Sequence, residues 1–201
     1  MAQPAPATRQ ALLDAAERLM LAHGVGATTV DQICDAASVT KGACFHYFAS
    51  KDALAQATLE RFCRRSGERY QAAPFNAKRD PLARLHGYID FTIAQVTDPF
   101  RDGCLVGVVS QELAESHPPF RRQCDQAFTG WAAELTTMLD AVKRHYAPRA
   151  RIDTRSLAEH FLAVFEGALI LAKARHDVAP VKAQLRHFQR YVDSLFPRTH
   201  P

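Results

Sequence analysis

The chain has 201 residues, of which 47% are hydrophobic and 23% are charged, and its net charge is +4. These values suit one or two small globular domains, and they exclude disorder along the whole chain, a membrane span and a histone-like basic coat. Residues 1–9 contain no apolar segment of the kind that a secretory signal needs, so we expect a cytoplasmic protein with no membrane partner.

Capping and helix-breaking residues predict nine helices and no strand. Thr29-Val-Asp-Gln32 is a capping-box pattern, in which the threonine hydroxyl accepts from the backbone N–H of the glutamine. Asp80-Pro81, Asp102 and Asp153 are each placed to cap a later helix. The first expected helix ends at Gly24. The other eight run from Thr29 to Ala36 or Ala37, from Lys41 to Tyr47, from Lys51 to about Ala72, from Asp80 to about Val96, from Gly103 to Glu115, from after Pro119 to about Tyr146, from Asp153 to about Arg175 and from Pro180 to Phe196.

The first fifty residues carry three short predicted helices, and a tight turn at Ser38 and Val39 separates the second from the third. This is the layout of a helix-turn-helix unit, whose second helix enters the major groove of DNA. Many helical proteins contain similar corners, so the layout alone does not decide the function.

The residue identities in this segment narrow the class of protein. Thr28–Leu54, TTVDQICDAASVTKGACFHYFASKDAL, resembles the DNA-binding signature of tetracycline-repressor-type (TetR family) regulators. Four positions depart from the family pattern: Cys34, Ser38, Ala43 and Phe45, the last standing where tyrosine is usual. The positions that match are Ile33, Ala37, Val39, Lys41, Gly42, Phe48, Ser50, Lys51 and Leu54.

The third predicted helix carries the candidate base contacts. Lys41, at its start, can reach a phosphate or a guanine edge, and Gly42 lets the backbone approach DNA closely. Ala43 offers a methyl group to a thymine methyl. His46 and Tyr47 project from the end of this helix, where the Tyr47 hydroxyl can donate to a phosphate.

Helix N-termini supply the candidate phosphate contacts. Thr29, Thr40 and Lys51 stand at the starts of predicted helices, which favour anions. The two threonines also serve as ordinary helix caps, and both roles can coexist. Residues 1–60 hold four basic and six acidic side chains, so non-specific DNA affinity must depend on a few placed cations.

The remaining 150 residues form a larger helical companion rich in aromatic side chains. The family resemblance implies that this part holds a small-molecule pocket and the dimer interface. For each aromatic residue, a plain core position is the alternative. The residues that we expect to line the pocket are Phe91, Val108, Phe128, Trp131 and Phe165.

The last two predicted helices carry apolar faces broader than one side of a core needs. In the eighth helix, Gly167, Ala168 and Ala172 allow another helix to approach closely. A two-fold four-helix interface is therefore expected, and the resemblance implies the same homodimer. Two recognition helices of a dimer can read half-sites about one turn of DNA apart.

Cys104 is a candidate sensor. If Asp102 caps the sixth helix, Cys104 takes its second position, where the helix N-terminus stabilises a thiolate. Asp102-Gly-Cys-Leu resembles a branch of the family in which this cysteine senses electrophiles or oxidants, with a lysine on helix eight that Lys173 matches. The alternative is a buried cysteine and a surface lysine.

Catalytic and metal-binding motifs are absent from the sequence. There is no glycine-rich phosphate loop, no His-Glu-x-x-His and no Gly-x-Ser-x-Gly, and the nine histidines are scattered. Five cysteines, none in Cys-x-x-Cys spacing, predict free thiols and no zinc site. We expect no enzyme, no metal and no cofactor.

Together these observations predict an all-α, homodimeric transcriptional regulator. Residues 1–50 form the DNA-binding domain, and residues 51–201 form the ligand-binding and dimerisation domain. We expect a repressor that leaves its operator when a small molecule binds or when Cys104 is modified. The alternative is a helical protein-interaction module without specific DNA binding, which the acidic balance of residues 1–60 favours.

Overall fold

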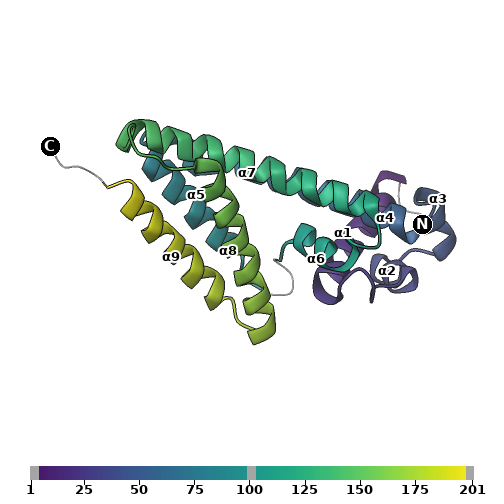
Figure 1. Cartoon of the computed structure of the whole chain (residues 1–201). Coiled ribbons are helices and arrows are strands. Elements are labelled where there is room, and N and C mark those ends of the chain that lie inside the picture. Colours follow the sequence, from purple (N-terminus) through teal and green to yellow (C-terminus); the bar gives the residue numbers. More distant parts are fainter. Residues whose placement is uncertain (1–4, 99–102, 198–201) are drawn as a thin grey trace. The chain divides into compact units, whose positions relative to one another are not determined.

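The computed structural model describes residues 5–98 and 103–197. These ranges contain nine α-helices, one short 3-10 helix and no strand, which confirms the predicted all-α class (Figure 1). No helix among them is long and apolar enough to cross a membrane. The elements are α1 (Ala5–His23), α2 (Val30–Ala37), α3 (Lys41–Tyr47), α4 (Lys51–Gln71), η1 (Pro74–Ala77), α5 (Pro81–Gln95), α6 (Leu105–Leu113), α7 (Pro118–Tyr146), α8 (Thr154–Arg175) and α9 (Ala179–Leu195).

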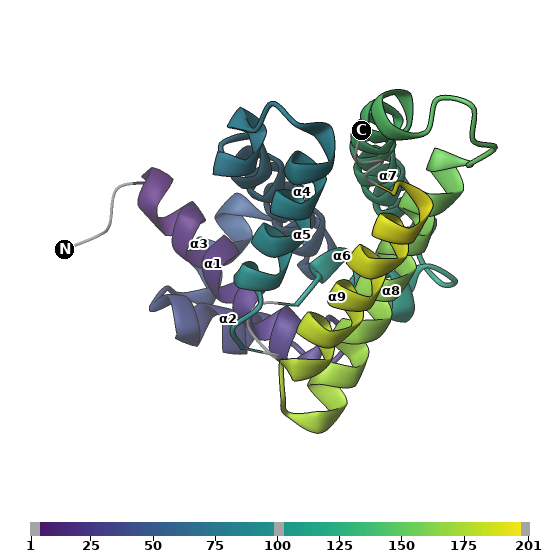
Figure 2. The same cartoon turned by 90° about the vertical axis from the view of Figure 1, so that its left-hand side faces the viewer.

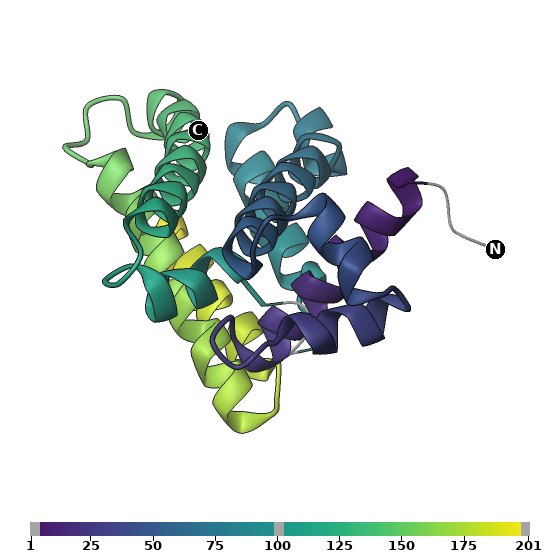
Figure 3. The same cartoon turned by 90° about the vertical axis from the view of Figure 1, so that its right-hand side faces the viewer.

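The chain packs into two compact units. The first comprises residues 1–67 and 104–125, and the second comprises residues 68–103 and 126–201. The boundaries fall inside α4 and α7, and α6 belongs to the first unit although it lies in the second half of the sequence. The three N-terminal helices, purple to blue in Figure 3, cross and contact one another. In the second unit α8 lies along α9 (Figure 2).

Local signals place the end of α1 and both ends of α2 as predicted. Gly24 ends α1 with a φ of +89°, and its N–H donates to the Met20 carbonyl. The capping box is formed, because the Gln32 N–H donates to the Thr29 hydroxyl while the Gln32 side chain accepts from the Thr29 N–H. Ser38 ends α2 in the left-handed conformation, with a φ of 56°.

A buried arginine joins α4 to α1 in this unit. Arg61 is only 5% exposed and forms ion pairs with Asp14 and Glu17, which lie on successive turns of α1. Arg65 adds a contact of 3.2 Å to Glu17. Because a buried charge is costly without a partner, these pairs fix where α4 lies on α1. The apolar core around them includes Leu12, Met20, Ile33, Phe48, Leu54 and Leu59.

Aromatic packing and polar contacts hold the second unit together. His86 of α5 lies 2.7 Å from Asp193 of α9, and Arg186 of α9 pairs with Asp90 of α5. A continuous group of ring contacts, which are edge-to-face, tilted or stacked, runs from α4 through η1 and α5 to α8 and α9. Its members are Tyr70, Phe75, Tyr88, Phe91, Phe161, Phe165 and Phe188.

Two details differ from the prediction. The helix expected from Gly103 begins at Leu105, and its N-cap is Cys104, so Cys104 does not occupy the second helical position. The expected cap, Asp102, lies outside the described residues. In addition, Pro74 does more than end α4, because it begins the 3-10 helix η1 as its first residue.

Candidate DNA-binding interface

The turn between α2 and α3 is built from short local contacts. The Val39 N–H donates to the Cys34 carbonyl at 3.0 Å, which closes the end of α2. Thr40 then caps α3, since its hydroxyl accepts from the Ala43 N–H at 3.2 Å. Cys44 anchors α3 in the core and is 2% exposed. These contacts set α3 at a fixed angle to α2, as a recognition helix requires.

One side of α3 is exposed and carries four residues with different chemistry. Lys41, Gly42 and His46 are exposed, as a DNA-contacting surface requires. Phe45 is 46% exposed, so its ring is accessible to a binding partner. Of the other predicted contacts on this helix, Ala43 and Tyr47 are half-buried.

Lys41 is held by an acidic neighbour on α2. Its ammonium lies 2.9 Å from a carboxylate oxygen of Asp31, and both side chains are more than half exposed. The hydrogen bond and the charge of Asp31 raise the pKa of Lys41 above its usual value. Lys41 is therefore charged throughout the physiological range, and DNA must compete with Asp31 for it.

The predicted phosphate contacts surround α3. Thr29 and Thr40 are exposed, and each hydroxyl already caps its own helix. Lys51, the first residue of α4, is half-buried and donates to the Gly26 carbonyl at 3.3 Å. All eight predicted DNA-contacting residues thus lie in the first unit, within the segment from Thr29 to Lys51.

Two residues of this unit were missed by sequence reasoning. The exposure of Phe45 was signalled only by its departure from the tyrosine that is usual there. Glu112 of α6 accepts from the Gly26 N–H at 2.8 Å, which links α6 to the loop between α1 and α2. No local sequence pattern signals this contact, because the two residues are 86 positions apart.

The cysteines of the first unit are mostly buried. Cys34 and Cys44 face each other between α2 and α3, and burial, followed by the neighbouring Cys34 sulfur, raises the pKa of Cys44 to about 11. Burial likewise raises the pKa of Cys63 to about 11. Cys104 is 6% exposed, and its Sγ accepts from the Gly107 N–H at 3.4 Å. That donor belongs to the first turn of α6, where it can also hydrogen-bond a thiolate.

The seven predicted effector residues are divided between the two units. Cys104 and Val108 belong to the first unit, and the other five belong to the second. In the second unit, Phe91 and Phe165 join the aromatic group described above. Phe128 and Trp131 instead form an edge-to-face pair of their own on α7, with ring centres 5.8 Å apart. Lys173 lies in the last turn of α8 and is half-buried.

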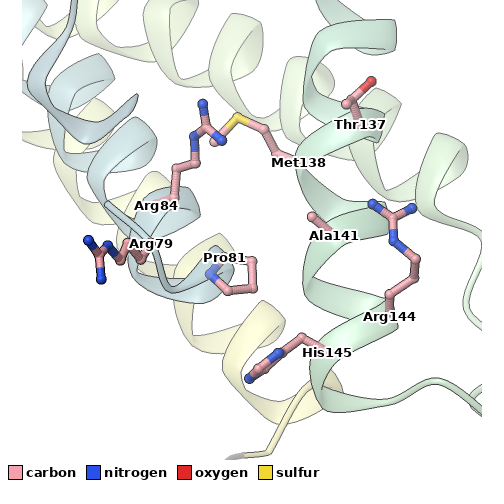
Figure 4. Close-up of a pocket in the computed structure, with 8 residues that line it drawn as sticks. All are labelled: Arg79, Pro81, Arg84, Thr137, Met138, Ala141, Arg144 and His145. Carbon is pink, nitrogen blue, oxygen red and sulfur yellow. The ribbon is translucent and has the colours of Figure 1, made fainter. Parts of the chain in front are cut away.

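A pocket of about 610 Å³ lies in the second unit between α5 and α7, and none of the predicted effector residues lines it (Figure 4). Its lining includes Arg79, Arg84 and Arg144, which sequence reasoning did not single out. Within the described part of the chain, no group of three or more His, Cys, Asp or Glu side chains is arranged to hold a metal ion.

The candidate dimer surface lies on the last two helices. Ala168 and Ala172 of α8 are buried, and α8 packs against α9 within the same unit. Ile170 and Leu171 of α8 and Tyr191 of α9 are exposed, at 51%, 39% and 47%. The second unit thus carries large apolar side chains on the outside of the α8–α9 pair.

Comparison with known proteins agrees with this geometry. The family model "Tetracyclin repressor-like, C-terminal domain" matches residues 81–188, and "Bacterial regulatory proteins, tetR family" matches residues 12–58. The transcriptional regulator AcuR of Cereibacter sphaeroides is 28% identical over 191 residues, covering 94% of this chain and 87% of AcuR. The repressor NemR of Escherichia coli K12 is 25% identical over 186 residues, covering 92% and 94%.

Solved structures extend the likeness to three dimensions. The regulatory protein TetR from Rhodobacter sphaeroides superposes with a TM-score of 0.81 at 28% identity, covering 90% of this chain and 97% of that one. The reduced form of Escherichia coli NemR gives a TM-score of 0.76 at 26% identity, covering 91% and 96%. Regulators of this family bind operator DNA and act as dimers. The chain belongs to the tetR family of bacterial regulatory proteins, and it is a DNA-binding transcriptional regulator.

Proposed function

We propose that this protein is a repressor whose two recognition helices enter the major groove of a palindromic operator, in the bacterial cytoplasm. The observation that carries the proposal is the exposed side of α3, where Lys41, Phe45 and His46 lie together on a helix fixed by its cap and its buried cysteine. A dimer bound in this way blocks access of the polymerase to the promoter. Residues 1–50, together with Lys51 at the start of α4, supply the DNA contacts, and no catalytic step is involved.

The contacts divide into two kinds. Lys41, Gly42, Ala43 and His46 approach the base edges, where an amine can donate to guanine and a methyl group can pack against thymine. The phosphate contacts come from the hydroxyls and the amine that flank α3, and they set the register of the helix on the duplex. These phosphate-contacting residues are Thr29, Thr40, Tyr47 and Lys51.

The dimer forms through α8 and α9, within residues 51–201. Ile170, Leu171 and Tyr191 support this assignment, because apolar side chains of this size are exposed on the outside of the helix pair. When two copies meet there, four helices enclose these side chains in a shared core. The two-fold axis of that bundle then fixes the spacing of the two α3 helices.

The inducing signal acts by favouring a spacing of the two α3 helices at which the dimer does not fit DNA. Two signals are candidates: a ligand in the second unit near Phe91, Phe128, Trp131 and Phe165, or covalent modification of Cys104. Support for the second comes from Cys104 at the N-cap of α6, the helix that also carries Glu112 against the Gly26 loop. A displaced α6 would therefore pull directly on the segment that precedes α2.

Fluorescence anisotropy with labelled DNA from upstream of the gene, and scrambled DNA as the reference, tests the proposal. Reduced wild type is expected to bind the upstream DNA specifically. Treatment with N-ethylmaleimide is expected to release wild type but not the Cys104→Ser variant, while Cys63→Ser serves as the matched control and is released like wild type. Release of Cys104→Ser as well would assign the response to another thiol, and specific binding that survives treatment in wild type would assign the signal to a pocket ligand.

The second candidate function, a helical interaction module, is favoured only by the net negative charge of residues 1–60. Absence of specific binding to any fragment of a genomic library would support it and would contradict the repressor. A steep loss of affinity with rising salt, combined with sequence preference, would reject it.

A further inference from the structure

The pocket between α5 and α7 lies entirely within the second unit, so its geometry does not depend on the first. Its volume is about 610 Å³, in the range of small-molecule sites. Figure 4 shows one wall formed by the start of α5 and the other by the second half of α7. The lining residues are Arg79, Pro81, Arg84, Thr137, Met138, Ala141, Arg144 and His145.

The charge of this pocket is unbalanced. Three arginines and a histidine line it, and no carboxylate does. Among the described residues, Arg79 and Arg144 have no hydrogen-bonding or ion-pairing partner, and Arg84 donates only to the neutral amide of Asn76. Elsewhere in the same unit arginines do find acids, as in the pairs Arg186–Asp90 and Arg155–Glu159.

The nearest carboxylate in sequence, Asp80, is engaged elsewhere. One of its oxygens accepts from the Ala83 N–H at 2.6 Å and caps α5. The other accepts from the hydroxyl of Tyr146, the last residue of α7. Asp80 therefore holds the two walls of the pocket together, and both its oxygens have donors other than the three arginines.

Arg84 is positioned before any ligand arrives. Its Nη2 donates to the Asn76 side-chain oxygen at 3.2 Å. The Asn76 amide nitrogen in turn donates to the carbonyls of Tyr70 and Gln71 at the end of α4, at 2.7 and 3.0 Å. In Figure 4 the Arg84 guanidinium extends toward the Met138 side chain across the pocket. A side chain that is already ordered loses little conformational freedom on binding.

We propose that the α5–α7 pocket binds a small organic polyanion, one that carries two or more carboxylate or phosphate groups on a short carbon frame. Arginine guanidinium groups bind such oxyanions through paired hydrogen bonds, and a single monovalent acid would leave two of the three charges unneutralised. Pro81, Met138 and Ala141 supply the apolar surface for the carbon frame. Inorganic anions would leave that surface unused.

Isothermal titration calorimetry of the full-length protein with citrate tests the proposal. Wild type is expected to bind one citrate per chain. Arg84→Gln/Arg144→Gln is expected to bind at least about tenfold more weakly, because each arginine contributes a charge-assisted bond. The matched control is Arg155→Gln/Arg175→Gln, which removes the same charge from α8 and is expected to bind like wild type. The neutral trimethyl ester of citrate is expected not to bind.

Two results would overturn the proposal. One is equal citrate affinity in wild type, the pocket variant and the control, which would show general attraction to a cationic surface. The other is no heat of binding with citrate up to about 10 mM. Circular dichroism melting checks that the pocket variant is folded, and Arg79→Gln replaces it if it is not. The titration contains no DNA, so its failure leaves the proposed repressor function unaffected.

Discussion

The Glu112 carboxylate accepts a hydrogen bond of 2.8 Å from the Gly26 N–H, and this bond connects α6 to the loop between α1 and α2. The Gly26 carbonyl accepts from Lys51 at the start of α4. The residue is therefore held from two sides, four positions before α2 begins. Cys104 caps the other end of α6, so one short helix joins the candidate sensor to the helix-turn-helix unit.

Replacing Glu112 with alanine is expected to weaken the response to N-ethylmaleimide more than it weakens operator binding. The variant keeps the buried core, so it still folds and binds the operator. Release by N-ethylmaleimide is expected to fall by about fivefold or more, because coupling free energies of 1–3 kcal/mol pass through such contacts. The measurement is the ratio of Kd values with and without treatment. Glu115→Ala, an exposed acid just beyond α6, is the control, and an unchanged ratio in Glu112→Ala would contradict the role of the contact.

Substitutions of Lys41 and of Asp31 are expected to have opposite effects on the affinity for DNA. Lys41→Ala is expected to weaken operator binding and to reduce the slope of log K against log salt by about one, as loss of one phosphate-neutralising cation requires. Asp31→Asn is expected to raise affinity for scrambled DNA, because Lys41 loses its competitor. Titrations at four salt concentrations check both, with Lys182→Ala on α9 as control. Equal slopes of log K against log salt for Lys41→Ala and wild type would show that Lys41 does not contact DNA.

Phe45 is expected to pack against a thymine methyl group in the major groove. A buried methylene contributes about 0.8 kcal/mol, so Phe45→Ala is expected to lose about fourfold or more in operator affinity. Replacing single operator thymines by uracil removes the methyl group and identifies the partner. At least one such replacement is expected to weaken the binding of wild type and to leave the binding of Phe45→Ala unchanged. Equal responses in both proteins would exclude this contact.

The thiols of Cys44, which is buried, and Cys63, which is half-buried, are expected to react slowly with iodoacetamide. Burial raises the pKa of each to about 11, so about one molecule in a thousand carries the thiolate at pH 8. Below that pKa the thiolate fraction grows tenfold per pH unit, and the alkylation rate is expected to follow it. Peptide mass spectrometry at pH 7, 8 and 9 measures the rates site by site. A rate that levels off below pH 9 would show a lower pKa.

Charge at the outer face of α8 is expected to separate the dimer. Ile170→Asp places a carboxylate where the proposed interface is apolar, and it is expected to give monomers in sedimentation analysis. The monomer still carries one intact helix-turn-helix unit but is expected to lose most of its operator affinity. Glu159→Asp on the same helix is the conservative control. A dimer that persists in both Ile170→Asp and Leu171→Asp would show that the interface lies elsewhere.

Helix ends could be predicted because their causes are local. Thr29, Asp80 and Asp153 cap the helices that the sequence predicts, since each hydroxyl or carboxylate bonds an N–H three residues on. The start of α6 was placed two residues too early, because a cysteine sulfur is an uncommon cap and Asp102 is a common one. The 3-10 helix at Pro74 was missed for a similar reason, since proline both ends and begins helices.

The α5–α7 pocket could not be predicted from the sequence. Arg79 and Arg84 come from one segment and Arg144 from another about sixty residues later, and no spacing relates them. Only the folded chain brings them to one pocket. The recognition helix was found because its residues are consecutive, while the link from Glu112 to Gly26 was missed because its two ends are far apart in sequence.

Gly24 is constrained both by its backbone conformation and by a neighbouring side chain. Its φ of +89° suits glycine alone among the common residues, and an added Cβ would lie 1.9 Å from a Glu112 oxygen. A Cβ added at Gly26, two residues on, would lie 3.5 Å from its nearest neighbour, a Glu112 oxygen. In a saturation-mutagenesis scan scored by repression, codon 24 is therefore expected to accept glycine only, whereas codon 26 accepts small residues. Intolerance at 24 would record the left-handed backbone that ends α1, because the Glu112 side chain can rotate away from an added Cβ.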